Sequence, residues 1–212
     1  MKQSRAKGGN IMITIGITGG VGAGKSAILK YLEEKYDAYI IVADELAKEL
    51  EEPGKEVYEK LVQCFGDTIL SQDKSIDKKA FANLIFGDED ALKKADSIIH
   101  PAVKEEILNR IKAKEADGCK VFIVEAALLI EEGYDKILDE IWYIYADEAV
   151  RFKRLEENRG YSREKSLSIM RKQKSDIEFR KYCKRIIDNS GELSETLDQT
   201  DAIMHSIKAA LI

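Results

Sequence analysis

Eight residues near the start of the chain have the types and the spacing that phosphate chemistry requires. They read GGVGAGKS from Gly19 to Ser26 and fit the pattern G-x-x-x-x-G-K-[S/T]. Glycines allow positive φ angles and a close approach of the backbone, so successive N–H groups can hold phosphate oxygens. Lys25 supplies a compact positive charge for the β- and γ-phosphates, and the Ser26 hydroxyl is a suitable oxygen ligand for Mg²⁺. The motif predicts a nucleoside-triphosphate site; the alternative is a glycine-rich turn without a ligand.

The residues on either side of the motif supply the elements that would position it. Ile13, Ile15 and Ile17 alternate with smaller residues, which indicates a short buried strand. Residues 27–32 place apolar side chains at helical spacing, so the loop would end at a helix N-terminus, whose partial positive charge also favours phosphate. The residues expected to contact the nucleotide here are Gly20, Val21, Gly22, Ala23, Gly24, Lys25, Ser26 and Ala27.

Acidic residues follow two further strand-like segments. Residues 121–124 are apolar and are followed by Glu125, as in the second element of nucleoside-triphosphate enzymes, where a carboxylate acts on Mg²⁺ directly or through water. An acid at a strand end is common, so Glu125 indicates a Mg²⁺ site only in combination with the glycine loop. We expect Ser26 and Glu125 to bind Mg²⁺, Glu125 either directly or through water. Asp44 lies just past the segment 39–42, at the start of a helix.

The remaining pattern predicts an α/β fold. Residues 141–145 and 185–188 read as a fourth and a fifth strand. Strands that alternate with helices imply a parallel five-stranded sheet of the P-loop NTPase type, covered by helices on both faces. The last helix is expected to pack on the sheet through Leu193, Leu197, Met204, Ile207 and Leu211.

Two helical blocks interrupt the strands of the nucleotide-binding core, which would comprise residues 11–54, 117–146 and 185–212. Residues 55–116 read as an inserted substrate-binding region, with Pro101 as the first residue of a helix. Residues 147–184 are strongly charged and read either as solvated helix faces or as a lid. Arg151 and Arg154 lie three apart on one helix face, so in a lid they would close together over the moving phosphoryl group.

Composition narrows the class of protein. The 212 residues carry 34 basic and 39 acidic side chains, with no long basic stripe, which argues against a nucleic-acid partner. The three cysteines are scattered, which favours a reduced, cytoplasmic protein over disulfides or a zinc site. No apolar run reaches membrane-spanning length. Residues 1–10 are basic, but the apolar stretch that follows is used as strand and loop, so we expect no secretion signal.

With these elements in place, the chain resembles the dephospho-CoA kinase family from about residue 13 to residue 191. The resemblance rests on the order and spacing of short motifs. They are ITGGVGAGKS, Asp44-Glu45-Leu46-Ala47, Glu52-Pro53-Gly54, Phe65-Gly66, Phe86, Ile98-Ile99-His100-Pro101, Leu128-Leu129, Glu131, Arg154-Leu155, Gln173, Ile187-Asp188-Asn189 and Gly191.

This resemblance implies transfer of the γ-phosphoryl group of ATP to the 3′-hydroxyl of dephospho-CoA, with Mg²⁺. It implies a helical CoA-binding part, residues 55–116, and a lid. Asp44 matches the acid proposed to accept the hydroxyl proton, although it could also be only a helix N-cap. The expected catalytic residues are Lys25, Asp44 and Arg154, and Asn189 joins the nucleotide contacts. The acceptor contacts expected are Asp44, His100, Leu128 and Glu131, and the further lid arginines are Arg151 and Arg159.

The chain also departs from the family pattern. The departures are Val42 for an acid, Lys78 for an arginine, Ala127 for a proline, Asn158 for the lid arginine, and Cys183-Lys184 for Ala-Asp. Lysine cannot reproduce a bidentate guanidinium contact. Two alternatives therefore stay open: a kinase of another nucleoside, nucleotide or pantetheine-bearing acceptor, and a non-catalytic nucleotide-binding protein. The Asn-Lys-x-Asp motif of a GTPase is missing, and nothing in the sequence indicates the oligomeric state.

Overall fold

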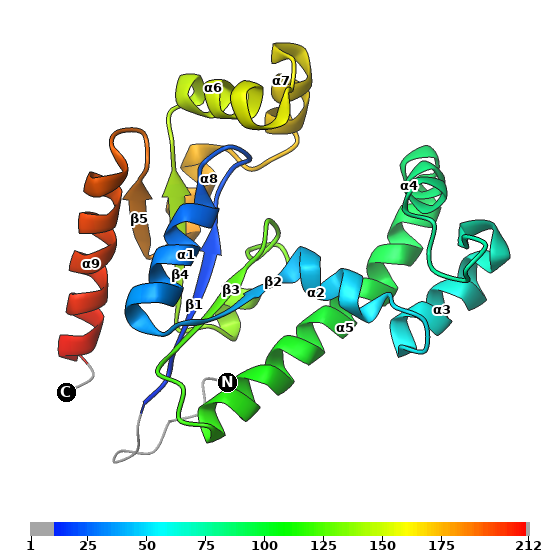
Figure 1. Ribbon diagram of the computed structural model, residues 1–212, viewed down its shortest axis with the longest axis horizontal. Coiled ribbons are helices and arrows are strands. Elements are labelled where there is room, and N and C mark those ends of the chain that lie inside the picture. Colours follow the sequence, from blue (N-terminus) through cyan, green and yellow to red (C-terminus); the bar gives the residue numbers. More distant parts are fainter. Residues whose placement is uncertain (1–10, 211–212) are drawn as a thin grey trace. The chain divides into compact units, whose positions relative to one another are not determined.

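The structure is a computed structural model that describes residues 11–210 and consists of two compact units. The first unit comprises the chain up to Ile40 and from Lys114 onward, and the second comprises Ile41–Ala113 (Figure 1). None of the helices described is long and apolar enough to span a membrane. The first unit contains the glycine loop and most of the sheet, so the candidate nucleotide site lies in this unit.

A five-stranded sheet of order β2-β3-β1-β4-β5 forms the centre of the first unit. The pairs β1–β3, β1–β4 and β4–β5 are parallel, which confirms the predicted fold class. The glycine loop follows the central strand β1, which is flanked by strands from later in the chain. The strands are β1 Ile13–Thr18, β2 Tyr39–Val42, β3 Val121–Glu125, β4 Glu140–Tyr145 and β5 Arg185–Asp188.

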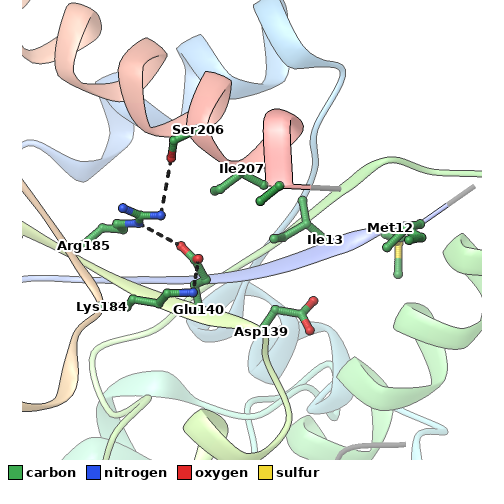
Figure 2. Close-up of a pocket in the computed structure, with 10 residues that line it drawn as sticks. Met12, Ile13, Asp139, Glu140, Lys184, Arg185, Ser206 and Ile207 are labelled. Atoms are coloured by element: carbon green, nitrogen blue, oxygen red, sulfur yellow. Dashed lines mark hydrogen bonds and ion pairs between the residues drawn. The ribbon is translucent and has the colours of Figure 1, made fainter. Parts of the chain in front are cut away.

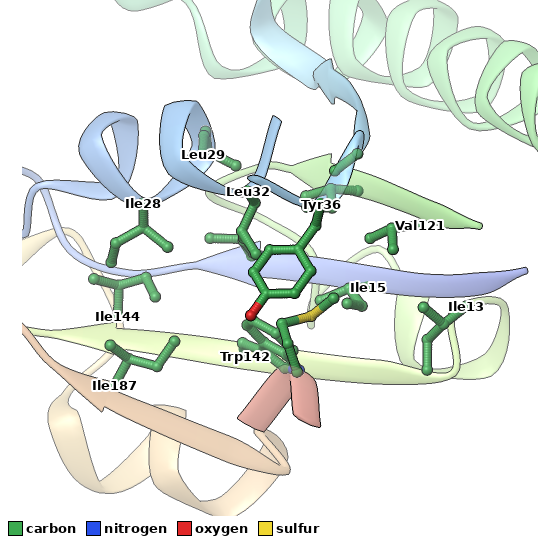
Figure 3. Packing of buried hydrophobic residues seen from close by; sticks show 14 of the residues in the cluster. Ile13, Ile15, Ile28, Leu29, Leu32, Tyr36, Val121, Trp142, Ile144 and Ile187 are labelled. Atoms are coloured by element: carbon green, nitrogen blue, oxygen red, sulfur yellow. The ribbon is translucent and has the colours of Figure 1, made fainter. Parts of the chain in front are cut away.

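One face of the sheet packs against α1 (Lys25–Tyr36) and α9 (Leu193–Ala210). Alternate residues of the strands point to this side, and Leu32 and Tyr36 of α1 pack there beside the fully buried Trp142 of β4 (Figure 3). Continuous apolar packing on this side fixes α1 to β1 and so holds the loop between them.

The buried face of α9 agrees with the prediction only in part. Met204 and Ile207 are buried as predicted, whereas Leu193 is 48% exposed, Leu197 is half-buried, and the other buried residues are Thr196 and Thr200. The Thr196 hydroxyl donates to Asn189 Oδ1 at 2.9 Å and the Thr200 hydroxyl to the Thr196 carbonyl at 2.8 Å, so the two threonines are satisfied where they are buried. Leu211 lies outside the described residues.

The opposite face is covered by α8 (Asp176–Tyr182) and by the segment 126–139. Phe179 of α8 stacks on Tyr143 of β4, with ring centroids 4.6 Å apart. A Cβ atom on Gly16 would lie 2.9 Å from Leu129 Cδ1, so a larger residue at position 16 requires the Leu129 side chain to shift. The segment 147–184, which the sequence predicts to be a lid, contains α6 Glu148–Arg159, α7 Arg163–Arg171 and α8.

The second unit is helical and has its own apolar cluster. It includes α2, so it begins before residue 55, where the sequence placed the start of the insertion. Val57, Leu61, Ile69, Phe81 and Ala95 form the buried centre of the cluster. Its helices are α2 Ala43–Leu50, α3 Glu56–Phe65, η1 Gly66–Ile69, α4 Lys78–Gly87 and most of α5 Glu89–Ala116.

The prediction for Pro101 was wrong, because this residue lies inside α5 rather than at a helix start. An internal proline costs about 3 kcal/mol of helix stability. The helix nevertheless continues, since Ala91 and Ala95 before the proline and Ile107 after it are all buried. The free energy gained by burying both halves of α5 outweighs the cost of the proline inside it.

Candidate active site

The glycine loop lies at the carboxyl edge of the sheet. The strand register places Ile17 beside Glu125 and Thr18 beside Tyr143, so β1, β3 and β4 end at the same edge. Ligands of open parallel sheets bind at this edge, near the point where the strand order reverses. Figure 1 shows α6 and α7 above the same ends of the strands.

The loop backbone exposes donors for an anion. Gly22 and Gly24 have positive φ angles of 80° and 86°. Gly24 is the residue that caps α1, and no side chain caps this helix end. Within residues 11–210, the N–H groups of Gly22 and Gly24 have no hydrogen-bond acceptor, whereas the Ala23 N–H donates to the Gly20 carbonyl at 3.1 Å. Unpaired N–H groups beside a helix N-terminus form a phosphate site.

Lys25 lies between the loop and the end of β3. Its Nζ donates to the Gly19 carbonyl at 2.9 Å and lies 3.4 Å from Glu125 Oε1. The side chains of Lys25 and Glu125 are 19% and 14% exposed, and Ser26 is exposed at the start of α1. A serine hydroxyl and one carboxylate suit a Mg²⁺ ion that keeps water and phosphate ligands, although no group of three His, Cys, Asp or Glu side chains in the described chain could hold a metal by itself.

Two arginines of α6 reach the loop. Arg151 Nε donates to the Val21 carbonyl at 2.8 Å, and Arg154 Nη1 donates to the Ala23 carbonyl at 3.3 Å. The solvated-face interpretation is therefore wrong for these two residues. Neither guanidinium forms an ion pair with a carboxylate of the described chain, and burial lowers the pKa of Arg151. Both arginines therefore bring to the loop a positive charge that no ion pair of the described chain neutralises.

The other lid residues named from the sequence lie apart from these contacts. Arg159 is exposed, with its guanidinium carbon 6.0 Å from the centre of the Tyr161 ring. Asn158 is also exposed, and its Nδ2 donates to the Arg154 carbonyl at 2.9 Å. The predicted phosphate contact of Arg159 stays a prediction.

Asn189 supports the loop from the end of β5. The side chain is 3% exposed; its Nδ2 donates to the Ala23 carbonyl at 2.7 Å, and its Oδ1 accepts the Thr196 hydroxyl at 2.9 Å. A Cβ atom on Gly24 would overlap with Asn189 Nδ2. The protein itself thus uses both ends of this amide, and its predicted contact with the nucleotide stays a prediction.

Gln173 is a site residue that the sequence-based list of contacts missed. Its Oε1 accepts the Val21 N–H at 2.9 Å and Arg151 Nη2 at 3.1 Å. Gln173 is one of the residues that resemble the family, but the sequence predicted no contact for it. Its neighbours in the sequence contain no pattern that indicates a contact with the glycine loop.

The residues predicted to bind the acceptor are divided between the two units. Leu128 is 44% exposed, and Glu131 lies 3.1 Å from Lys174 Nζ, a hydrogen bond that raises the pKa of Lys174. In the second unit, His100 Nε2 lies 3.6 Å from Asp96 Oδ1. Asp44 is the exposed second residue of α2. The cap of α2 is Val42, without a side-chain hydrogen bond, so the N-cap interpretation of Asp44 was wrong. The acceptor roles stay predictions.

A separate hollow of about 280 Å³ lies at the amino edge of the sheet (Figure 2). The buried Glu140 carboxylate lies 2.5 Å from Lys184 Nζ and 3.4 Å from Arg185 Nε. Burial by itself raises the pKa of Glu140, but hydrogen bonds from Lys184 and Trp142 and the positive charges of Lys184 and Arg185 outweigh it, so the pKa is lowered. Both cations of this hollow form ion pairs with the same carboxylate, whereas Arg151 and Arg154 at the glycine loop form no ion pair with a carboxylate of the described chain. Lys184, a departure from the family pattern, has a structural partner here.

A parallel sheet, a glycine loop with Lys25 and Ser26, and arginines of α6 that reach this loop define the class of P-loop kinases. A family model for dephospho-CoA kinase matches residues 13–195. The chain belongs to the dephospho-CoA kinase family.

Individual relatives agree with this membership. The chain is 35% identical over 198 residues to a dephospho-CoA kinase of Carboxydothermus hydrogenoformans, covering 93% of this chain and 96% of the relative. A dephospho-CoA kinase of Geobacter metallireducens is 37% identical, with 91% and 95% covered. Among solved structures, a protein of Thermus thermophilus matches with a TM-score of 0.77 and 27% identity, over 92% of this chain and 97% of its own.

Proposed function

We propose that this chain transfers the γ-phosphoryl group of ATP to the 3′-hydroxyl of dephospho-CoA, giving coenzyme A, and that the glycine loop and the two lid arginines carry the transfer. The observation that supports the proposal most strongly is the pair of arginines without carboxylate partners on an intact phosphate loop. These two cations can contact a transferring phosphoryl group without first leaving a carboxylate of the protein.

The residues act mainly by position and charge. Phosphoryl transfer spreads negative charge over the moving group, so fixed donors aimed at that charge supply most of the stabilisation. The free N–H groups of Gly22 and Gly24 hold phosphate oxygens, and Lys25 neutralises the β- and γ-phosphates. Arg151 and Arg154 add positive charge from the lid side. The Ser26 hydroxyl and, directly or through water, the Glu125 carboxylate would hold Mg²⁺, which when bound would supply positive charge to the phosphates.

The acceptor side of the proposal rests on the second unit and the segment after β3. Asp44 orients the ribose hydroxyl and accepts its proton, and His100, Leu128 and Glu131 contact the acceptor. Residues 55–116 supply the CoA-binding part, and the segment 147–184 is the lid. General-base assistance is modest in loose transition states, so Asp44 contributes less than the charges around the phosphates. Three free thiols are consistent with a reduced, cytoplasmic enzyme.

A direct assay tests the proposal. Purified protein with MgATP and dephospho-CoA should yield coenzyme A, detected by mass, whereas a protein that leaves dephospho-CoA unphosphorylated contradicts it. An acceptor panel of nucleosides, nucleotides and other pantetheine compounds tests the alternative raised by the exposed Lys78. Asp44→Asn should slow the transfer while ATP binding stays close to wild type, and unchanged turnover would remove Asp44 from the mechanism.

A further inference from the structure

Three residues close a small ring of hydrogen bonds between the lid and the phosphate loop. The Val21 N–H donates to Gln173 Oε1, Arg151 Nη2 donates to the same oxygen, and Arg151 Nε donates to the Val21 carbonyl. Because both groups that face Gln173 are donors, the amide must present its oxygen rather than its nitrogen. Gln173 lies between α7 and α8, and its own N–H donates to the Met170 carbonyl at 3.1 Å.

This ring occupies one edge of the Arg151 guanidinium and leaves the other edge without a hydrogen-bond partner in the described chain. Nε and Nη2 are directed to oxygens of the protein, whereas Nη1 has no partner within residues 11–210. An arginine has five N–H donors in a planar fork that fits phosphate oxygens in pairs. The edge that carries Nη1 is therefore available for an anion on the loop.

The oxygen that holds Arg151 is neutral. A carboxylate at residue 173 would accept the same two hydrogen bonds but would neutralise the guanidinium, and its negative charge would face the incoming phosphates. We propose that Gln173 is a positioning residue: it fixes Arg151 on the phosphate loop through an uncharged oxygen, so that the positive charge of Arg151 remains free for the transferring phosphoryl group. This inference deepens the proposed function and rests on it.

A double-mutant cycle on the full chain tests the proposal. Gln173→Met, which keeps the length but removes the acceptor, should lower kcat by about tenfold, the size expected for a hydrogen bond to a charged group. The KM for ATP should stay within about twofold, because the change acts on transition-state charge. Arg151→Met should lower kcat by roughly a hundredfold or more, and the double variant should match Arg151→Met alone. Multiplied losses in the double variant, or an unchanged kcat in Gln173→Met, would overturn the proposal.

Gln173→Glu separates positioning by a neutral oxygen from a merely structural tether. If the tether alone matters, glutamate restores kcat relative to Gln173→Met; the proposal instead requires a kcat at or below that of Gln173→Met, with the melting temperature retained. Lys172→Met, an exposed change in the same segment, is the matched control and should behave as wild type.

Calorimetric titration with MgATP separates the two proposals, since it involves no acceptor. Gln173→Glu should bind MgATP several-fold more weakly than wild type, and equal affinity would contradict the charge argument whatever the acceptor is. A wild type that binds MgATP but leaves dephospho-CoA unchanged would contradict only the proposed function.

Discussion

Asn189→Leu is the substitution for which the structure yields the most specific expectation. Leucine keeps the number and branching of the side-chain heavy atoms and removes both polar ends of a residue that is 3% exposed. Two buried hydrogen bonds disappear, one to the Ala23 carbonyl at 2.7 Å and one from the Thr196 hydroxyl at 2.9 Å.

The size of the stability loss depends on which hydrogen bonds the two partners of Asn189 retain. The Ala23 carbonyl still accepts Arg154 Nη1 at 3.3 Å, and the Thr196 hydroxyl still has the Asp188 carbonyl at 3.2 Å. Neither partner is left without a hydrogen bond, so the larger penalty for an unsatisfied buried group does not apply. At about 1 kcal/mol for each net bond, we expect the free energy of unfolding to fall by about 2 kcal/mol.

Urea unfolding of wild type and variant measures this loss, and the KM for ATP reports on the loop. Thr196→Val is the matched control for the Ala23 contact. It removes the hydroxyl that donates to Asn189 Oδ1 and to the Asp188 carbonyl, and it should cost about 2 kcal/mol because the buried Oδ1 loses its partner. It should leave the KM for ATP unchanged because the Ala23 contact remains. Asn189→Leu should raise that KM, since the loop carbonyl loses its short hydrogen bond. An Asn189→Leu variant as stable as the wild type, with an unchanged KM, would refute the reasoning.

Three further predictions concern charge and reactivity. Lys25→Met should lower kcat about a thousandfold, since roughly 4 kcal/mol of transition-state stabilisation is lost; single-turnover rates above a tenth of wild type would contradict this. Burial alone raises the pKa of Asp201, but hydrogen bonds from Lys35 and two tyrosines outweigh it and bring the pKa to about 2. The resulting stability is present above the ordinary carboxyl pKa and is lost as the pH falls toward 2. Asp201→Asn should thus cost roughly 1 kcal/mol at pH 7, after allowance for the exposed Lys35, and the cost should shrink in unfolding curves from pH 4 to 2. Iodoacetamide at pH 8 should modify the exposed Cys64 first, whereas burial raises the pKa of Cys183 to about 12; mass spectrometry that finds Cys183 modified in the native protein would contradict this.

The sequence determined those features that depend on neighbours along the chain. The strand Ile13–Thr18, the glycine loop and the helix that follows are specified by alternation, by glycines and by helical spacing within about 25 residues. The five strands were predicted for the same reason, because each is a short apolar run with turn residues at its ends. The family could be recognised because these local motifs occur in a fixed order.

The tertiary structure decided which distant residues complete the site. Gln173 and Asn189 reach the loop across 152 and 166 residues of sequence, and no local pattern marks either contact. The same holds for Pro101 inside α5 and for the buried threonines of α9, where packing overrides local preference. Local propensities amount to about 1 kcal/mol or less per residue for most side chains, whereas burial and satisfied buried hydrogen bonds sum over many contacts. Parallel strand pairing brings the ends of β1, β4 and β5 together, and only that pairing places the lid and the end of β5 against the phosphate loop.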